Sequence, residues 1–150
     1  MDELTFFEPV RERLQQVEER LHSQAKGYNP AMEAALKHLL SSGGKRIRPV
    51  LTLLTGGMLG TDPDRLVAIA AAVEMLHTAT LVHDDLIDGS LMRRGIPTLN
   101  TKWTSAATVL TGDFLFARAA KLAAETKHSG RTVTAGLPRA DGLNDLLVAK

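Results

Sequence analysis

The segment Glu74–Arg94 carries three carboxylates within five residues, Asp84, Asp85 and Asp88, after a stretch that is otherwise rich in alanine and leucine. If this stretch is a helix, Asp84 and Asp88 stand on one face, one turn and about 6 Å of rise apart. Acidic side chains at a helix C-terminus meet the negative end of the helix dipole and also repel one another. Such a cluster is unfavourable without a cation, so the sequence predicts a cation site at the end of a mostly buried helix.

The oxygen ligands of this cluster favour Mg²⁺, which usually takes one or two carboxylates together with phosphate oxygens of a substrate. Asp84 and Asp88 can supply that pair. Asp85 is rotated by about 100° from Asp84, so it is expected to lie outside the first ligand shell or to face solvent. The alternative is a solvated helix end, which the apolar residues before the cluster disfavour. The spacing of an EF-hand is not matched.

A basic segment, Gly43-Gly44-Lys45-Arg46-Ile47-Arg48, opens another predicted helix. Backbone N–H groups at a helix N-terminus attract anions, and Lys45 and Arg48 share a face because they are three residues apart. A Walker A loop is excluded because Arg46 stands where Ser or Thr is required. A solvated first turn is the alternative. Phosphate binding is slightly favoured, because cations in a first turn oppose the helix dipole.

Three more residues are candidates for the same anion site. His77 lies two turns before the carboxylates, where a binding role and a core role are equally well supported. Arg93 and Arg94 follow the cluster and can bind phosphate bidentately beside a metal, although adjacent arginines are more often surface charge. Two acids within apolar helices, Glu74 and Asp113, are each expected to pair with a basic residue.

Apolar residues recur at helical spacing in five segments, and no strand-like alternation persists, which predicts an all-α fold. The expected helices span about residues 4–24, 30–41, 45–58, 63–88 and 104–126. Asn29-Pro30 and Asp62-Pro63 are start signals for the second and fourth helices. The third helix is expected to bury one stripe of side chains, namely Ile47, Leu51, Leu54 and Met58.

Charge and composition narrow the function classes. The net charge of +1 argues neither for a nucleic acid nor for a membrane surface as partner. The N-terminal sequence MDELTFFEPVRER lacks the basic and apolar regions of a signal peptide. The sequence has no uninterrupted run of 18 apolar residues, so no membrane span is expected. The chain has no cysteine, which excludes disulfides and thiol catalysis and fits the expected cytoplasmic location.

Three motifs together resemble the all-trans isoprenyl diphosphate synthases of the polyprenyl synthetase family. They are GGKRIRP at Gly43–Pro49, EMLHTATLVHDDLIDGSLMRRGIPTLN at Glu74–Asn100, and GDFLFARA at Gly112–Ala119. Within them, His83–Arg94 resembles the first aspartate-rich motif of that family. The resemblance covers residues 1–128 and implies an antiparallel helical bundle of the isoprenoid synthase type, of which this chain would supply about five helices. It also implies a homo- or hetero-dimer.

The resemblance implies a Mg²⁺-dependent prenyltransferase that condenses an allylic diphosphate with isopentenyl diphosphate. Carried over by position, the metal ligands would be Asp84 and Asp88. Arg93 would bind the allylic diphosphate and act with the two aspartates in catalysis. The residues implied for isopentenyl diphosphate are Lys45, Arg48, His77 and Arg94. The small residues Ala79 and Thr80 just before the motif imply a long-chain all-trans polyprenyl product.

A complete family member is longer than this chain and carries a second aspartate-rich motif, which this sequence lacks. Residues 129–150 form a divergent tail that does not resemble the family and is expected to be mostly irregular, as in a truncated or frame-shifted product or a small subunit. Two hypotheses follow. The chain is a prenyltransferase, or it is a non-catalytic subunit or fragment that binds a diphosphate substrate or a partner chain without turnover.

Overall fold

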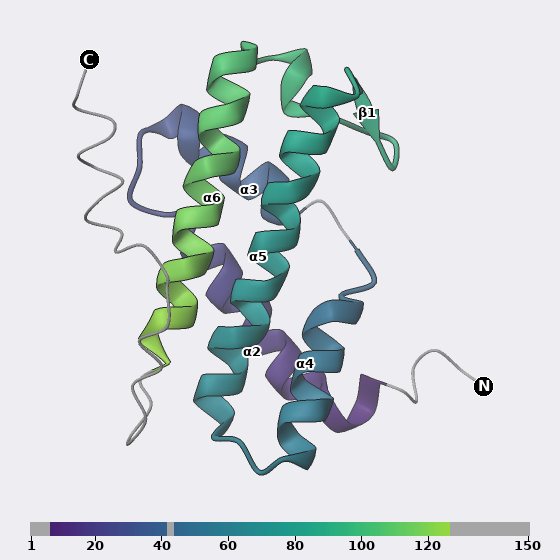
Figure 1. Ribbon diagram of the computed structural model, residues 1–150, viewed down its shortest axis with the longest axis vertical. Coiled ribbons are helices and arrows are strands. Elements are labelled where there is room, and N and C mark those ends of the chain that lie inside the picture. The colour runs from purple at the N-terminus through teal and green to yellow at the C-terminus, as the bar shows by residue number, and fades with distance from the viewer. Residues whose placement is uncertain (1–6, 42–43, 127–150) are drawn as a thin grey trace.

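The computed structural model describes residues 7–41 and 44–126, and its long elements are five α-helices (Figure 1). The elements in chain order are η1 (Glu8–Val10), α2 (Arg11–Ser23), α3 (Pro30–Ser41), α4 (Ile47–Met58), α5 (Pro63–Ile87), β1 (Met92–Arg93), β2 (Ile96–Pro97), η2 (Leu99–Thr101) and α6 (Ser105–Glu125). The predicted all-α class is therefore confirmed. The tail predicted to be irregular, residues 129–150, lies outside the described residues.

Local side chains set the helix starts where the sequence predicts them. The side chains of Asn29, Asp62 and Thr104 each accept a hydrogen bond from the backbone N–H three residues further along, at 2.9, 3.1 and 3.2 Å. A cap of this kind stabilises a helix by about 1 kcal/mol, because it satisfies a donor that the helix leaves unpaired. The first helix differs from its predicted span, since the turn around Pro9 is a 3₁₀ turn and α2 begins only at Arg11.

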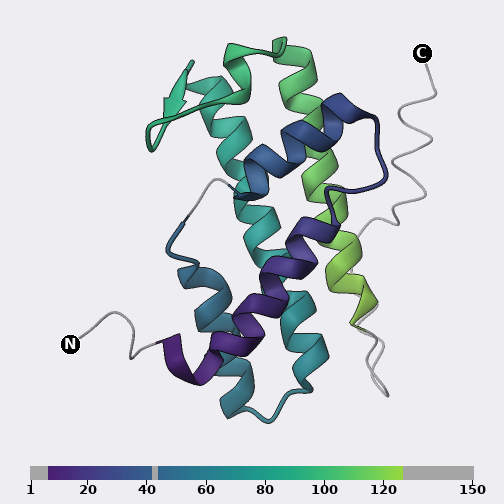
Figure 2. The ribbon, with the colours of Figure 1, turned by 180° about the vertical axis from the view of Figure 1, so that it is seen from behind.

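Helices α5 and α6 lie side by side along the long axis of the molecule, and α2 and α3 cross behind them (Figures 1 and 2). Helix α4 packs beside the N-terminal half of α5. The core draws on every helix, and its largest fully buried apolar side chains are Leu21, Leu36, Leu40, Leu53, Met75, Leu115 and Leu122. The described part of the chain places no helix over the opposite face of the α5–α6 pair.

The buried face of α4 is only partly the predicted one, since Leu54 alone of the predicted stripe packs against the core. Ile47, Leu51 and Met58 are 51%, 49% and 87% exposed, whereas Val50 and Leu53 are fully buried. The rest of the prediction was wrong because α4 is apolar on more than one side, so its neighbours decide which side is covered. Helix α5 approaches the other face so closely that a Cβ atom on Gly56 would lie 2.0 Å from a methyl carbon of Leu66.

By length and composition, α5 is the one helix among the described residues that is apolar enough to cross a membrane. However, 61% of its apolar window is buried within the bundle, and the core helices of water-soluble proteins pass the same test. Its contacts with α6, α4 and α2 account for that burial. The absence of a membrane span therefore stays a prediction.

Candidate functional site

The C-terminal half of α5 presents two neighbouring sectors of side chains. One sector lines a cavity and consists of Glu74, His77, Thr78, Leu81, Val82 and Asp85. The other sector is exposed and consists of Leu76, Thr80, Asp84, Ile87 and Asp88. Because each residue turns the helix by about 100°, His77 and Asp84 differ in direction by only about 20°. His77 therefore lies at the boundary between the two sectors, close in direction to Asp84 but within the cavity lining.

The cavity has a volume of about 640 Å³ and lies between the start of α4, the helix α5 and the hairpin β1–β2. Its lining includes all five residues that the sequence analysis assigned to phosphate groups, namely Lys45, Arg48, His77, Arg93 and Arg94. These residues come from three segments that are far apart in the sequence. A concave site of this size with several convergent cations can hold a small anionic molecule.

Asp84 and Asp88 do not line the cavity but stand beside it on the exposed sector. They are one helical turn apart, since the backbone N–H of Asp88 donates to the carbonyl of Asp84 at 2.9 Å. Within residues 7–41 and 44–126, neither carboxylate takes part in a hydrogen bond or an ion pair, and no group of three or more acidic or histidine side chains forms a metal cluster. The pair fits Mg²⁺, which takes its remaining ligands from water and phosphate.

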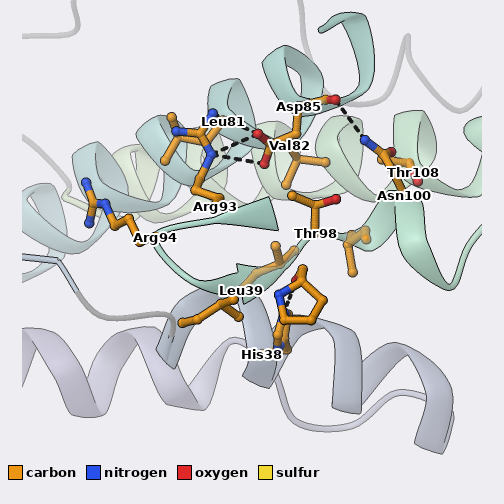
Figure 3. Close-up of a pocket in the computed structure, with 13 residues that line it drawn as sticks. His38, Leu39, Leu81, Val82, Asp85, Arg93, Arg94, Thr98, Asn100 and Thr108 are labelled. Carbon is orange, nitrogen blue, oxygen red and sulfur yellow. Dashed lines mark hydrogen bonds and ion pairs between the residues drawn. The ribbon is translucent and has the colours of Figure 1, made fainter. Parts of the chain in front are cut away.

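Asp85 is buried and holds Arg93 (Figure 3). The Nε of Arg93 lies 2.9 and 3.0 Å from the two carboxylate oxygens, and this hydrogen bond raises the pKa of Arg93. The backbone carbonyl of Asp85 accepts a bond from Nδ2 of Asn100 at 2.8 Å. Asp85 therefore does not face solvent, one of its two predicted positions, but fastens the hairpin to the end of α5.

A smaller pocket of about 60 Å³ continues from the cavity under the hairpin (Figure 3). His38 reaches it from α3, and Nε2 of His38 lies 2.8 Å from the carbonyl of Pro97. The Oδ1 atom of Asn100 is buried there, with no hydrogen-bond partner in the described part of the chain. Its volume is about a tenth of that of the cavity, so the cavity is the better candidate for a ligand site.

Arg46 was not assigned a role from the sequence, yet it has the most extensive contacts in the site. Its guanidinium donates to Glu18 of α2, to Glu74 of α5 at 3.0 Å and to the carbonyl of Leu40 at 2.8 Å. Burial alone would lower the pKa of Arg46, but the two carboxylates outweigh it and raise that pKa. The predicted basic partner of Glu74 is thus Arg46. The sequence signal was the acid within an apolar helix.

His77 is half-buried in a cavity that is rich in cations. Burial lowers the pKa of His77, and the nearby charge of Arg48 lowers it further, whereas Glu74 opposes the shift. Arg93 and Arg94 act in the same direction as Arg48. Burial and the surrounding cations thus favour a neutral imidazole, and a bound anion would favour the protonated one.

The other predicted acid, Asp113, pairs with His83 at the interface of α5 and α6. The Nε2 atom of His83 lies 3.5 Å from Oδ1 of Asp113 and 3.2 Å from the carbonyl of Val109. The imidazole also stacks on Phe116 with ring centroids 6.0 Å apart. His83 therefore acts in helix packing and does not enter the cavity.

Comparisons with known proteins find relatives in sequence and in structure. A family model described as polyprenyl synthetase matches residues 29–137. The chain is 48% identical over 110 residues to heptaprenyl diphosphate synthase component 2 from Geobacillus stearothermophilus, covering 73% of this chain and 34% of that protein. It is 39% identical over 118 residues to geranylgeranyl diphosphate synthase from Saccharolobus solfataricus, covering 79% and 35%.

Among solved structures, a polyprenyl synthase from Caulobacter crescentus, complexed with calcium and isoprenyl diphosphate, superimposes with a TM-score of 0.77. The two sequences are 39% identical, and the match covers 83% of this chain and 38% of that one. The chain thus spans about a third of the length of the curated relatives that it matches.

Proposed function

Because the chain belongs to the polyprenyl synthetase family, we propose that it forms the isopentenyl diphosphate-binding part of a prenyltransferase that elongates allylic diphosphates. The observation that carries this proposal is the meeting of Lys45, Arg48, His77 and Arg94 in one cavity. A diphosphate group needs several donors and positive charges around it, and guanidinium groups bind its oxygens bidentately. The Caulobacter relative, whose structure contains isoprenyl diphosphate, supports the choice of ligand.

Asp84 and Asp88 are the residues that would hold Mg²⁺, whose positive charge would stabilise the departing diphosphate. Arg93 lies between the two parts of the site, and its Nη1 makes no hydrogen bond within the described residues. In the proposed reaction the allylic C–O bond breaks and its electron pair leaves with the diphosphate. The double bond of isopentenyl diphosphate then forms the new C–C bond, and a proton is lost.

Isothermal titration of the 150-residue chain with isopentenyl diphosphate tests the proposal. Arg48→Ala should weaken binding by about 10-fold or more, because it removes a charge-assisted contact. Arg20→Ala is the matched control, since Arg20 is exposed and pairs with Glu125 outside the cavity. Absence of binding, or equal effects of the two substitutions, would refute the assignment of the cavity.

The second candidate is a subunit that binds diphosphate without turnover until a partner chain joins it. The name of the Geobacillus relative, component 2 of its synthase, favours this reading. Incubation of the chain with Mg²⁺, isopentenyl diphosphate and an allylic diphosphate distinguishes the two candidates. Elongated product from the chain alone supports the enzyme, whereas binding without product supports the subunit.

We also propose that the chain forms a homo- or hetero-dimer, which light scattering tests. The proposed location is the cytoplasm.

We also propose a long-chain product, because the residue that precedes the proposed metal ligands on the exposed sector of α5 has a small side chain. Thr80 lies on this sector one turn before Asp84. Ala79 is fully buried among the helices, so the smallness of Thr80 matters more for a growing tail than that of Ala79. In any assembly that turns over, Thr80→Phe should shorten the product, as measured by chromatography. An unchanged product length would contradict the proposal.

A further inference from the structure

The start of α4 and the turn before it hold two of the proposed ligand-binding residues, Arg48 and Lys45, on either side of the partly buried Arg46. The Arg46 side chain is 15% exposed, and its partners Glu18 and Glu74 are 29% and 9% exposed. Its contacts reach α2, the last turn of α3 and the middle of α5. One side chain therefore ties the start of α4 to three other helices.

The backbone of Arg46 is also unusual. Its φ of 47° lies in the left-handed region, which L-residues with side chains rarely adopt. The residue nevertheless occupies the N-cap position of α4 without a side-chain cap, and its carbonyl accepts the first helical bond from Val50. Such a conformation costs about 1 kcal/mol or more and persists only where surrounding contacts impose it. The partly buried ion pairs of Arg46 can supply such contacts.

We propose that Arg46 is a positioning residue: its network with Glu18 and Glu74 fixes the turn that directs Lys45 and Arg48 toward the diphosphate. The inference rests on the proposed function for the identity of the ligand, but not for the network itself. Two carboxylates neutralise Arg46, so it adds little attraction for an anion. Its contribution is geometric, because a displaced turn would separate Lys45 and Arg48 from His77 across the cavity.

The opposite role, a direct contact between Arg46 and the diphosphate, predicts a different response to loss of Glu74. Glu74 lines the cavity and is negatively charged, so Glu74→Gln should strengthen anion binding if charge alone mattered. If Glu74 holds Arg46 in place, the same substitution should weaken binding. The sign of the change therefore separates positioning from direct contact.

The experiment compares wild type with Glu74→Gln, Arg46→Lys and the control Arg20→Lys, all in the 150-residue chain. Arg46→Lys keeps the charge but loses the planar fork that reaches several acceptors. Calorimetry measures affinity for isopentenyl diphosphate at a temperature where circular dichroism shows every variant folded. Hydrogen exchange of the peptide Gly44–Val50 measures how firmly the turn is held, without any ligand.

The expected result is about a 10-fold loss of affinity for Glu74→Gln and Arg46→Lys, within the usual range for coupled neighbours, with faster exchange of Gly44–Val50. Arg20→Lys should change neither quantity. Equal or tighter binding by Glu74→Gln, or unchanged exchange in both network variants, would overturn the inference. If wild type binds no isopentenyl diphosphate, the proposed function fails. Exchange would then decide separately whether the network holds the turn.

Discussion

Arg93 approaches Asp85 with two nitrogens: Nε lies 2.9 Å from Oδ1, and Nη2 lies 2.8 Å from the same oxygen. The side chains are 37% and 11% exposed, so the pair is partly shielded from water. This ion pair joins the hairpin, which also contains Arg94, to the last turns of α5. Of the three clustered carboxylates, Asp85 thus has a partner within the chain, whereas Asp84 and Asp88 stand on the exposed sector.

The first prediction concerns this ion pair. Asp85→Asn should lower the free energy of unfolding by about 1–2 kcal/mol, because a partly buried guanidinium loses its charged acceptor. Asp84→Asn is the matched control and should change that free energy by less than about 0.5 kcal/mol, since its carboxylate is exposed. Urea denaturation of the two variants measures both. Equal losses of stability would contradict the anchoring role of Asp85.

The second prediction concerns the proposed metal ligands. Asp84→Asn should reduce the Mg²⁺-dependent part of inorganic diphosphate binding by about 10-fold or more, because it removes half of the carboxylate pair. Without Mg²⁺ the substitution should have little effect or strengthen binding, because a negative charge is lost. Calorimetry with and without Mg²⁺ measures this. Asp64→Asn, at the exposed start of the same helix, should leave the Mg²⁺ effect intact.

The third prediction concerns pH. Burial and the charge of Arg48 hold the pKa of His77 below its ordinary value of 6.5 in the folded chain. Below pH 6.5 the unfolded chain therefore binds a proton that the folded chain resists, so His77 costs stability as the pH falls through that range. His77→Gln should lose less stability than wild type on acidification. Denaturation curves across this pH range check the difference. Parallel losses in both chains would contradict it.

The fourth prediction concerns the contact between α5 and α6. A Cβ atom at Gly112 would lie 2.2 Å from Nε2 of His83, so Gly112→Ala should cost about 1–3 kcal/mol of stability. Gly57→Ala is the control, because its Cβ would meet the nearest atom, Nη1 of Arg13, at an ordinary 3.8 Å. That change should stabilise the helix by up to about 1 kcal/mol.

A double variant tests the cause of the fourth effect. If the clash with the imidazole is responsible, His83→Ala should cost less in the Gly112→Ala background than in wild type, as a double-mutant cycle would measure. Additive costs would mean that Gly112 matters for another reason. Thermal or urea unfolding of the four chains gives the required free energies.

Features set by neighbouring residues were predictable from the sequence. The starts of α3 and α5 follow from Asn29-Pro30 and Asp62-Pro63, and each capping bond forms within four residues of chain. The grouping of Lys45, Arg48 and His77 was anticipated by resemblance and agrees with the cavity. Their roles in binding remain proposals.

Features set by distant residues were not predictable in this way. Arg46 pairs with Glu18 and Glu74, each 28 residues away in opposite directions along the chain, and no local pattern marks that pairing. The buried side of α4 depends on where α2 and α5 lie, because a helix that is apolar on more than one side does not by itself fix which side is covered. The turn of about 100° per helical residue predicts that Asp85 points in a different direction from Asp84. Its partner Arg93, however, comes from a hairpin that the sequence indicated only as a loop.

The two sectors of α5 show that the spacing of residues along this helix sets the direction in which each site side chain points. Substitution at one position alters one side chain, whereas a one-residue insertion between Thr80 and Asp84 would turn everything after it by about 100°. Asp84 would then occupy the direction that Asp85 has now, facing the cavity, and Asp85 would turn away from the cavity by the same angle. The spacing between His77 and Asp84 is thus as constrained as the identity of either residue, because length along the helix is converted into orientation around it.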